Sequence, residues 1–374
     1  MRMNLRASCV MAGLGLCLTA MAQVPDLLNA FEAGGRAMAT GGGSAVTDAS
    51  TLSTIENPAG LAYLKGKSFA VSFRNLPTST TRTSGNFTDR TNSTEQGAGR
   101  FGLSHIGYAT PYGKGVVGVS YTIGGYVKNT TTGNNLQNGT LSVRGLAEVT
   151  EAQTNFFTAS YAWRQRDLNI GAGLVFASQY ARASQRYALF DAGNNQVGST
   201  ESNVSGNGYG FGLVVGVQGA TGGENPLAWG FSLRTPIELQ GNGDSAAVYD
   251  RIPGQASVGL AGRLPLGRGE EFASWAAQLS YPCGGDDNAI FARKDMVSFG
   301  FGVEYNFSRL NAIWPVRFGI AVVPSGGNGF EDRNAFTVGF GYRPKGRDYS
   351  IDLSFARPSG GGPYDIALGF TYRK

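Results

Sequence analysis

YDIALGFTY, residues 364–372 near the end of the chain, alternates apolar or aromatic side chains with small or polar ones. The apolar set is Tyr364, Ile366, Leu368, Phe370 and Tyr372. Successive side chains of a β-strand point to opposite faces, so a period of two indicates a strand with one face against an apolar medium.

The same alternation recurs from Lys67 onward, in short segments that turn residues separate. We count fourteen segments: 66–77, 100–111, 115–128, 152–165, 168–190, 206–219, 227–240, 252–265, 272–282, 296–307, 314–323, 334–344, 347–357 and 363–372. An even number suits a bacterial barrel, which closes on itself and leaves no unpaired edge in lipid. The sequence therefore predicts an all-β fold, a 14-stranded antiparallel transmembrane β-barrel over residues 66–374.

The connections between these segments fall into two classes. The long, polar ones are Thr78–Gly99, Lys128–Glu151, Asp191–Ser205, Gly241–Arg251 and Pro282–Asp295. The tight ones are Pro111–Lys114, Gln165–Asp167 and Pro344–Gly346. Long loops at one end and short turns at the other are typical of outer-membrane barrels. A soluble β-sandwich has little reason to sort its loops in this way.

The first 22 residues have the features of a secretory signal peptide. A basic start that includes Arg2 and Arg6 precedes an apolar run, and Ala20-Met-Ala22 forms a small-residue cleavage site. Removal of residues 1–22 lowers the formal charge from +5 to +3 and leaves Cys283 as the one cysteine, so no internal disulfide is expected. No Lys/Arg cluster accompanies the mild basic excess, which argues against a nucleic-acid partner.

Charged and polar side chains fall on the strand faces opposite the apolar ones. By parity the lumen holds Arg74, Arg234, Arg263, Gln278, Glu304, Arg317 and Asp352. A charge that faces lipid at mid-depth costs roughly 2–4 kcal/mol, so the lumen is the favourable place for these groups.

Residues 23–65 do not alternate. Glycines are frequent between residues 34 and 43, and Pro58 restricts the backbone at Asn57. One interpretation is a disordered leader. The apolar residues Leu28, Phe31, Val46, Leu52, Ile55 and Leu61 favour a compact plug inside the lumen instead. We therefore expect an N-terminal hatch over residues 23–65.

Four stretches carry a family resemblance: GGRAMATGGGSAVTDAS (34–50), NPAGLA (57–62), SLRTPIELQGNG (232–243) and IPGQASVGLAGRL (252–264). In this order, ahead of the closing strands, they resemble the FadL family of outer-membrane transporters for long-chain fatty acids and other hydrophobic compounds. The resemblance implies hatch residues Asp48, Asn57, Pro58 and Ala59. It also implies passive uptake across the outer membrane of a Gram-negative-type bacterium, with fatty acids or hydrocarbons and outer-membrane lipids as partners. NPAGLA also occurs in PorV-like barrels, which implies as an alternative a shuttle or partner in protein secretion.

The resemblance further implies lateral diffusion of ligand through a break in the third strand. Gly124 and Gly125 lie inside that strand, where a glycine pair weakens the hydrogen-bonded ladder, and Gly118 is a further candidate. The alternative is that these glycines only permit close packing.

A fatty-acid carboxylate would bind a cation in the lumen. The candidates are Arg74, Arg234, Arg263 and Arg317. The competing interpretation pairs these arginines with Glu304 or Asp352 in a structural network.

An enzyme is not expected. His105 is the only histidine, and a lone histidine beside Ser104 is more often a wall residue than a general base. The sequence has no P-loop, nucleophile elbow or metal motif, so no cofactor is expected. Cys283 lies in an expected loop as an unreactive thiol. Three functions stay open: a transporter with a plugged lumen, an open porin and a secretion shuttle.

Overall fold

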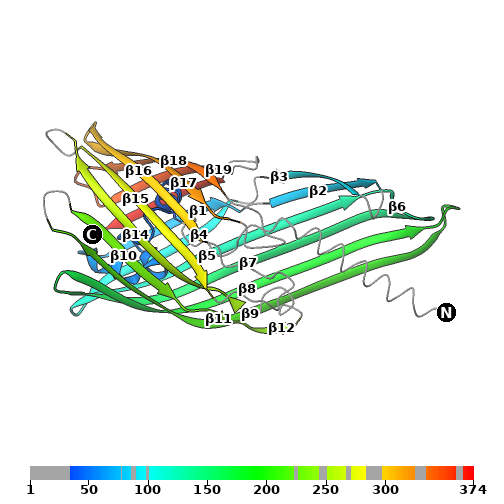
Figure 1. Ribbon diagram of the computed structural model, residues 1–374, viewed down its shortest axis with the longest axis horizontal. Coiled ribbons are helices and arrows are strands. Elements are labelled where there is room, and N and C mark those ends of the chain that lie inside the picture. The colour runs from blue at the N-terminus through cyan, green and yellow to red at the C-terminus, as the bar shows by residue number, and fades with distance from the viewer. Residues whose placement is uncertain are drawn as a thin grey trace.

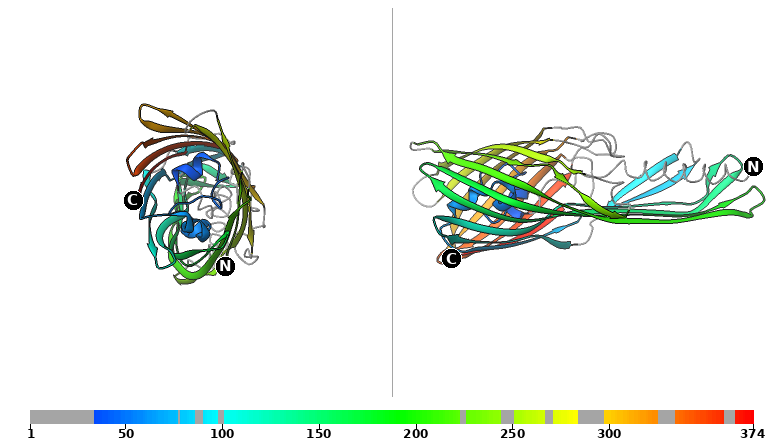
Figure 2. Two further views of the ribbon diagram at one scale, coloured as in Figure 1. Left: turned by 90° about the vertical axis from the view of Figure 1, so that its left-hand side faces the viewer. Right: turned by 90° about the horizontal axis from the view of Figure 1, so that it is seen from below.

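The computed structural model describes residues 34–76, 78–85, 90–97, 101–222, 226–243, 251–266, 271–283, 297–324, 334–358 and 365–374. The expected signal peptide lies outside these residues. Eighteen strands form one sheet, and without β2, β3, β6 and β12 the remaining 14 make a closed antiparallel barrel (Figures 1 and 2). The first and last barrel strands pair from Ser68–Arg373 to Arg74–Ala367, which closes the cylinder.

The predicted strands correspond one to one with the observed ones, so the predicted fold class is confirmed. The barrel strands are β1 (Ser68–Asn75), β4 (Phe101–Tyr112), β5 (Gly115–Gly133), β7 (Leu141–Gln165), β8 (Leu168–Phe190), β9 (Gln196–Ala220), β10 (Leu227–Arg234), β14 (Gly254–Pro265), β15 (Phe272–Cys283), β16 (Ser298–Arg309), β17 (Ala312–Val322), β18 (Ala335–Pro344), β19 (Tyr349–Pro358) and β20 (Asp365–Arg373).

Burial follows the predicted alternation. On β10, Phe231 and Leu233 are exposed on the outer face, whereas Ser232 and Arg234 are buried on the inner face. The exposed large hydrophobic side chains recur on β9, β14, β17 and β18 at the same outward parity. An apolar outer belt on a closed barrel, with polar groups inside, is the architecture that crosses an outer membrane many times.

Three expected loops are in fact strands. In the first of them, β2 (Thr78–Gly85) and β3 (Arg90–Gly97) pair antiparallel, and β5, β7, β8 and β9 continue through Lys128–Glu151 and Asp191–Ser205. Together with β6 (Leu136–Asn138) they form a sheet that extends well beyond the barrel (Figures 1 and 2). We call this sheet the projection. Thr, Ser, Asn and Gly dominate it because it lies beyond the apolar belt, so the sequence lacks the apolar alternation that would have revealed these strands.

One predicted strand is shorter than expected. The 227–240 segment leaves the wall after Arg234, and Thr235–Leu239 turns inward before β12 (Gln240–Gly243) rejoins β9. Short strands β11 (Ile237–Glu238) and β13 (Arg251–Ile252) pair with each other there. Ile237 and Ile252 become fully buried, so this inward fold fills part of the lumen.

Residues 34–64, which we call the lumen segment, pack inside the barrel (Figure 2). They contain α2 (Gly35–Ala39), α3 (Ser53–Glu56) and the 3₁₀ helix η3 (Pro58–Tyr63). In the part of the chain that the structure describes, no helix has the length and apolarity needed to cross a membrane.

Candidate functional site

The Asn-Pro-Ala motif fastens the lumen segment to the wall. The Asn57 side-chain amide donates to the Val46 carbonyl at 2.9 Å and to the Val217 carbonyl of β9 at 3.3 Å, and its oxygen accepts the Ala59 N–H at 3.2 Å. A Cβ added at Gly216 would overlap the Asn57 amide, and one at Gly171 would overlap Pro58. Glycines in β8 and β9 therefore form the cradle in which this motif lies.

A second contact of the same kind lies across the barrel. Gly41 has φ +60, and a side chain there would collide with the Ile320 backbone of β17. A Cβ at Gly300 or Gly302 of β16 would meet Gly41 or Thr40. The glycine-rich leader therefore crosses the lumen at backbone contact with the wall.

Charged side chains connect α2 to three strands. Arg36 Nη1 lies 2.7 Å from Asp48 Oδ1, and Arg36 Nε lies 3.3 Å from Glu304 Oε2. The fully buried Arg317 places Nε 2.5 Å from Glu304 Oε2 and Nη1 2.7 Å from Asp352 Oδ1. Nearby Glu304 and Asp48 raise the pKa of Arg36, so this guanidinium stays charged. The network fixes α2 against β16, β17 and β19.

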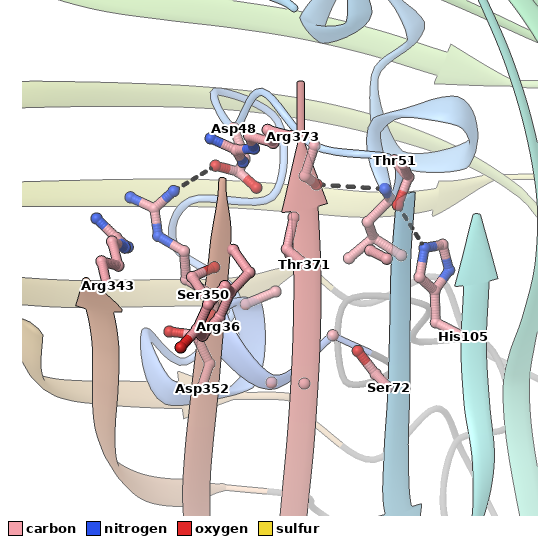
Figure 3. Close-up of a pocket in the computed structure, with 18 of the residues that line it drawn as sticks. Arg36, Asp48, Thr51, Ser72, His105, Arg343, Ser350, Asp352, Thr371 and Arg373 are labelled. Carbon is pink, nitrogen blue, oxygen red and sulfur yellow. Dashed lines mark hydrogen bonds and ion pairs between the residues drawn. The ribbon is translucent and has the colours of Figure 1, made fainter. Parts of the chain in front are cut away.

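Two cavities flank Arg36 and Asp48. The larger, of about 330 Å³, separates the lumen segment from β1, β4 and β18–β20, and Figure 3 shows Ser72, His105, Arg343 and Arg373 around it. The smaller, of about 220 Å³, lies between the lumen segment and β14–β16. Both have mixed polar and apolar linings and lie on the side of the lumen segment that faces the short turns.

The wall is interrupted beside Gly124. The β5–β7 register shifts between Ile123 and Gly125, which makes Gly124 a β-bulge. The β4–β5 ladder ends at His105–Thr122, and β5 has no further pairing on that edge until Lys128 meets β2. Within the described residues, positions 101–104 of β4 and 123–127 of β5 are thus adjacent strand segments without a ladder. Gly124 is one of the two adjacent glycines at which the sequence predicted a weakened hydrogen-bonded ladder.

An apolar cluster lies against the inner side of this interruption. The fully buried Phe156 of β7 fills the space that Gly124 leaves, since a Cβ at Gly124 would overlap its ring. The cluster comprises Ala37, Leu52, Ile55, Phe156, Val175, Ala177, Val214, Ile237 and Ile252.

Arg234 and Glu56 are the charged groups beside this cluster. The Arg234 guanidinium carbon lies 4.9 Å from the Phe156 ring centre, and its Nη2 donates to Gln255 at 3.4 Å. Burial raises the pKa of Glu56 to about 7, and Arg234 opposes that rise. The Arg234 cation, the Glu56 carboxyl group with its pKa of about 7 and the apolar cluster therefore lie next to the wall break.

The remaining predicted candidates lie in different surroundings. A Cβ at Gly118 would meet Thr54 and Leu61, so this glycine accommodates the lumen segment. Gly125 follows the bulge directly and pairs with Thr154. Arg74 is buried and donates from Nε to the Asn75 carbonyl at 3.2 Å. Arg263 faces inward as expected and lines the smaller cavity, but it is exposed because β14 ends two residues later; its guanidinium carbon lies 3.6 Å from the Phe272 ring centre.

His105 is a buried wall residue. One ring nitrogen lies 2.9 Å from Thr51 Oγ1 of the lumen segment and the other 2.9 Å from Thr122 Oγ1 of β5. Cys283 is a free, half-exposed thiol at the end of β15. No cluster of three or more metal-ligating side chains occurs in the described ranges.

Sequence reasoning missed Phe156, Glu56 and Arg36. Phe156 precedes Phe157, and only the strand parity of the neighbouring Thr158 and Ser160 could have placed it inside. Glu56 and Arg36 lie in the non-alternating segment, where no periodicity indicates which side chains meet.

No family model and no curated protein matches this sequence. Several solved structures match the fold of this chain. A FadL homologue from Pseudomonas aeruginosa matches at TM-score 0.57 and 14% identity, over 94% of this chain and 99% of that one. The toluene transporter TbuX from Ralstonia pickettii gives 0.53 and 13%, over 91% and 98%. A deletion mutant of TodX, a monoaromatic hydrocarbon channel, gives 0.59 and 12%, over 91% and 98%. The chain therefore has the fold of the FadL-type outer-membrane channels.

Proposed function

We propose that this barrel is a passive outer-membrane transporter for hydrophobic compounds. The observation that carries the proposal is the interrupted β4–β5 ladder at Gly124, which lies directly outside an apolar cluster in the lumen. The lumen segment lies inside the barrel and acts as the hatch, so the route to the periplasm along the barrel axis is obstructed. A ligand in the lumen then has the wall as its shortest way into the membrane.

The driving force needs no energy source. A ligand that enters at the end with the projection, contacts the cluster around Phe156 and leaves between β4 and β5 transfers its apolar surface from water to lipid. This transfer is worth about 0.8 kcal/mol for each methylene group. The solved channels with this fold carry names of hydrocarbon transporters, which supports the same class of ligand.

Within this class we propose amphipathic carboxylates such as long-chain fatty acids. Arg234 has the position that such a ligand requires, because its guanidinium borders the apolar cluster and the wall break together. The other candidates are less suitable: Arg317 is bound by Glu304 and Asp352, Arg263 lies at the rim, and Arg74 donates to the Asn75 carbonyl. A buried guanidinium–carboxylate contact is a strong, charge-assisted interaction.

Deletion of Gly124 tests the route. The deletion removes the extra residue and makes the β5–β7 register continuous, so every neighbouring side chain keeps its face. In proteoliposomes we expect the variant to bind a labelled fatty acid as wild type does but to release it into the bilayer at least tenfold more slowly.

Deletion of Val197 is the matched control. It also removes one extra residue at a register shift, but in the projection between β8 and β9. The control should release ligand at the wild-type rate. Equal release from all three proteins would contradict the lateral route, and the absence of any lipid or hydrocarbon binding to wild type would contradict the transporter proposal itself.

A further inference from the structure

The end of the barrel with the short turns carries an open ring of basic side chains. Among the described residues at this end the exposed bases are Lys65, Lys67, Lys114, Arg164, Arg166, Arg263, Arg309, Lys345, Arg347, Arg373 and Lys374. The exposed acids described there are Asp167 and Asp348. Arg263, Arg347 and Arg373 line the lumen cavities, so eight of these eleven bases remain for the outer surface, against two exposed acids among the described residues.

All four tryptophans of the chain lie just inside this ring. Trp163, Trp229, Trp275 and Trp314 each occur within four residues of the strand end at the short turns. Each has the outward parity of exposed neighbours on its own strand, such as Phe231 beside Trp229. Tryptophan prefers the level of lipid headgroups, so the four rings place that level at this height of the barrel.

Aromatic pairs strengthen this assignment. Tyr161 stacks on Trp163 at 5.9 Å and Tyr305 on Phe307 at 6.1 Å, and Trp314 lies 4.9 Å from Tyr342. Lys345 follows in the turn beside Trp314, where its N–H donates to the Asn311 carbonyl at 2.9 Å. The cations therefore begin where the aromatic belt ends, at the depth of phosphate groups.

We propose that this basic ring binds the phosphate groups of anionic phospholipids in the leaflet that surrounds the short-turn end. The bases occur in the turns of β4–β5, β7–β8, β16–β17 and β18–β19 and at the start of β1, so the open ring runs from β16 through β20 and β1 to β8; the described residues of the β9–β10 and β14–β15 turns add no base. The four tryptophans place the lipid headgroups at this same height, so lipid phosphates are the anions that the open ring meets. Short turns face the periplasm in outer-membrane barrels, which assigns the ring to the inner leaflet.

In the described part of the projection, two exposed arginines have acids beside them. In the projection, Arg182 is register-paired with Glu151 and Arg186 with Glu201. Acids on neighbouring strands thus accompany these exposed arginines. The charge asymmetry between the two ends indicates selectivity for a negative surface at one leaflet.

The four tryptophans supply the test, because their fluorescence reports lipid at the ring itself. The purified barrel is reconstituted in phosphatidylcholine, and brominated phosphatidylglycerol or brominated phosphatidylcholine is titrated in as quencher. We expect the anionic lipid to associate about fivefold more strongly at low salt. Screening in 0.5 M NaCl should abolish most of this preference.

Two triple variants localise the effect. Lys114→Gln/Arg166→Gln/Lys345→Gln should lower the preference below twofold, whereas Arg82→Gln/Arg182→Gln/Arg186→Gln in the projection removes the same charge and should leave it unchanged. Equal quenching by both lipids with the wild-type barrel, or an equal loss in both variants, would overturn the proposal. None of these outcomes depends on whether the barrel transports a ligand.

Discussion

The guanidinium of Arg234 lies 4.9 Å from the centre of the Phe156 ring, and that ring fills the space against Gly124. A single stack therefore connects a lumen cation, an aromatic ring and the bulged strand of the wall. Two of its three members were predicted from the sequence, and the ring that joins them was not.

Substitution of Arg234 should separate charged from neutral ligands. For Arg234→Gln we expect dodecanoate affinity to fall about 10- to 100-fold, the equivalent of about 1.5–3 kcal/mol for a hydrogen bond to a charged group. Dodecanol affinity should change little. Tritiated-ligand binding in detergent gives both values. Arg263→Gln, which removes a similar stacked arginine at the rim, is the control. Equal losses for acid and alcohol would exclude a carboxylate contact at Arg234.

Crowding of the Asn57 cradle should displace the lumen segment. In Gly216→Ala the new methyl group overlaps the Asn57 side chain, and overpacking of this kind costs about 1–3 kcal/mol. We expect new ion conductance in planar bilayers, because the obstruction of the lumen is loosened. Gly222→Ala adds a methyl group with nothing within 4 Å and should behave as wild type. If Gly216→Ala showed no new ion conductance, the contact between Asn57 and Gly216 would not be what holds the lumen segment in place.

Loss of Arg317 should destabilise the barrel strongly. Arg317→Met leaves Glu304 and Asp352 buried without their central cation, and removal of one partner from a buried ion pair costs about 3–5 kcal/mol. Denaturant unfolding in micelles measures this loss of folding free energy. Arg166→Met, at an exposed turn, should change stability by less than about 0.5 kcal/mol. Similar values for the two variants would refute a structural role for the network.

Glu56 should make stability depend on pH near neutrality. Burial raises its pKa from 4.5 to about 7, so the folded state favours the protonated carboxyl group. The stabilisation is complete below pH 4.5 and is lost as pH rises through 7. Unfolding of wild type and Glu56→Gln at pH 5 to 9 checks this. The unfolding free energy of Glu56→Gln should not fall over this pH range. If it falls as much as that of wild type, Glu56 is not the group responsible.

The barrel could be predicted from sequence because lipid imposes a period of two on every strand that crosses it. Tyr209 to Val217 and Ile351 to Phe355 show this pattern, and both lie in observed strands. The projection could not be predicted, because Asn129, Thr131 and Thr150 pair beyond the apolar belt, where no apolar alternation is required.

In the site, too, part could be predicted from the alternation of side chains and part could not. Strand parity placed Arg234, Glu304 and Arg317 inside, and all three are buried. Which of them pair depends on register between distant strands and on the path of the lumen segment, as in the contact of Arg36 with Glu304. Arg263 shows the limit of parity: it faces the smaller lumen cavity as predicted, but it is exposed because the strand ends two residues later.

Photolabelling with a diazirine-bearing alkane tests the central claim, that ligand leaves through the wall between β4 and β5. After irradiation of the reconstituted barrel and digestion, we expect labelled peptides that contain residues 101–104 and 123–127, together with Phe156. Deletion of Gly124 should remove the label from the two wall segments and keep it on Phe156. Label confined to Arg343, Arg347 and the other residues around the short-turn cavities, with none on β4 or β5, would contradict the account.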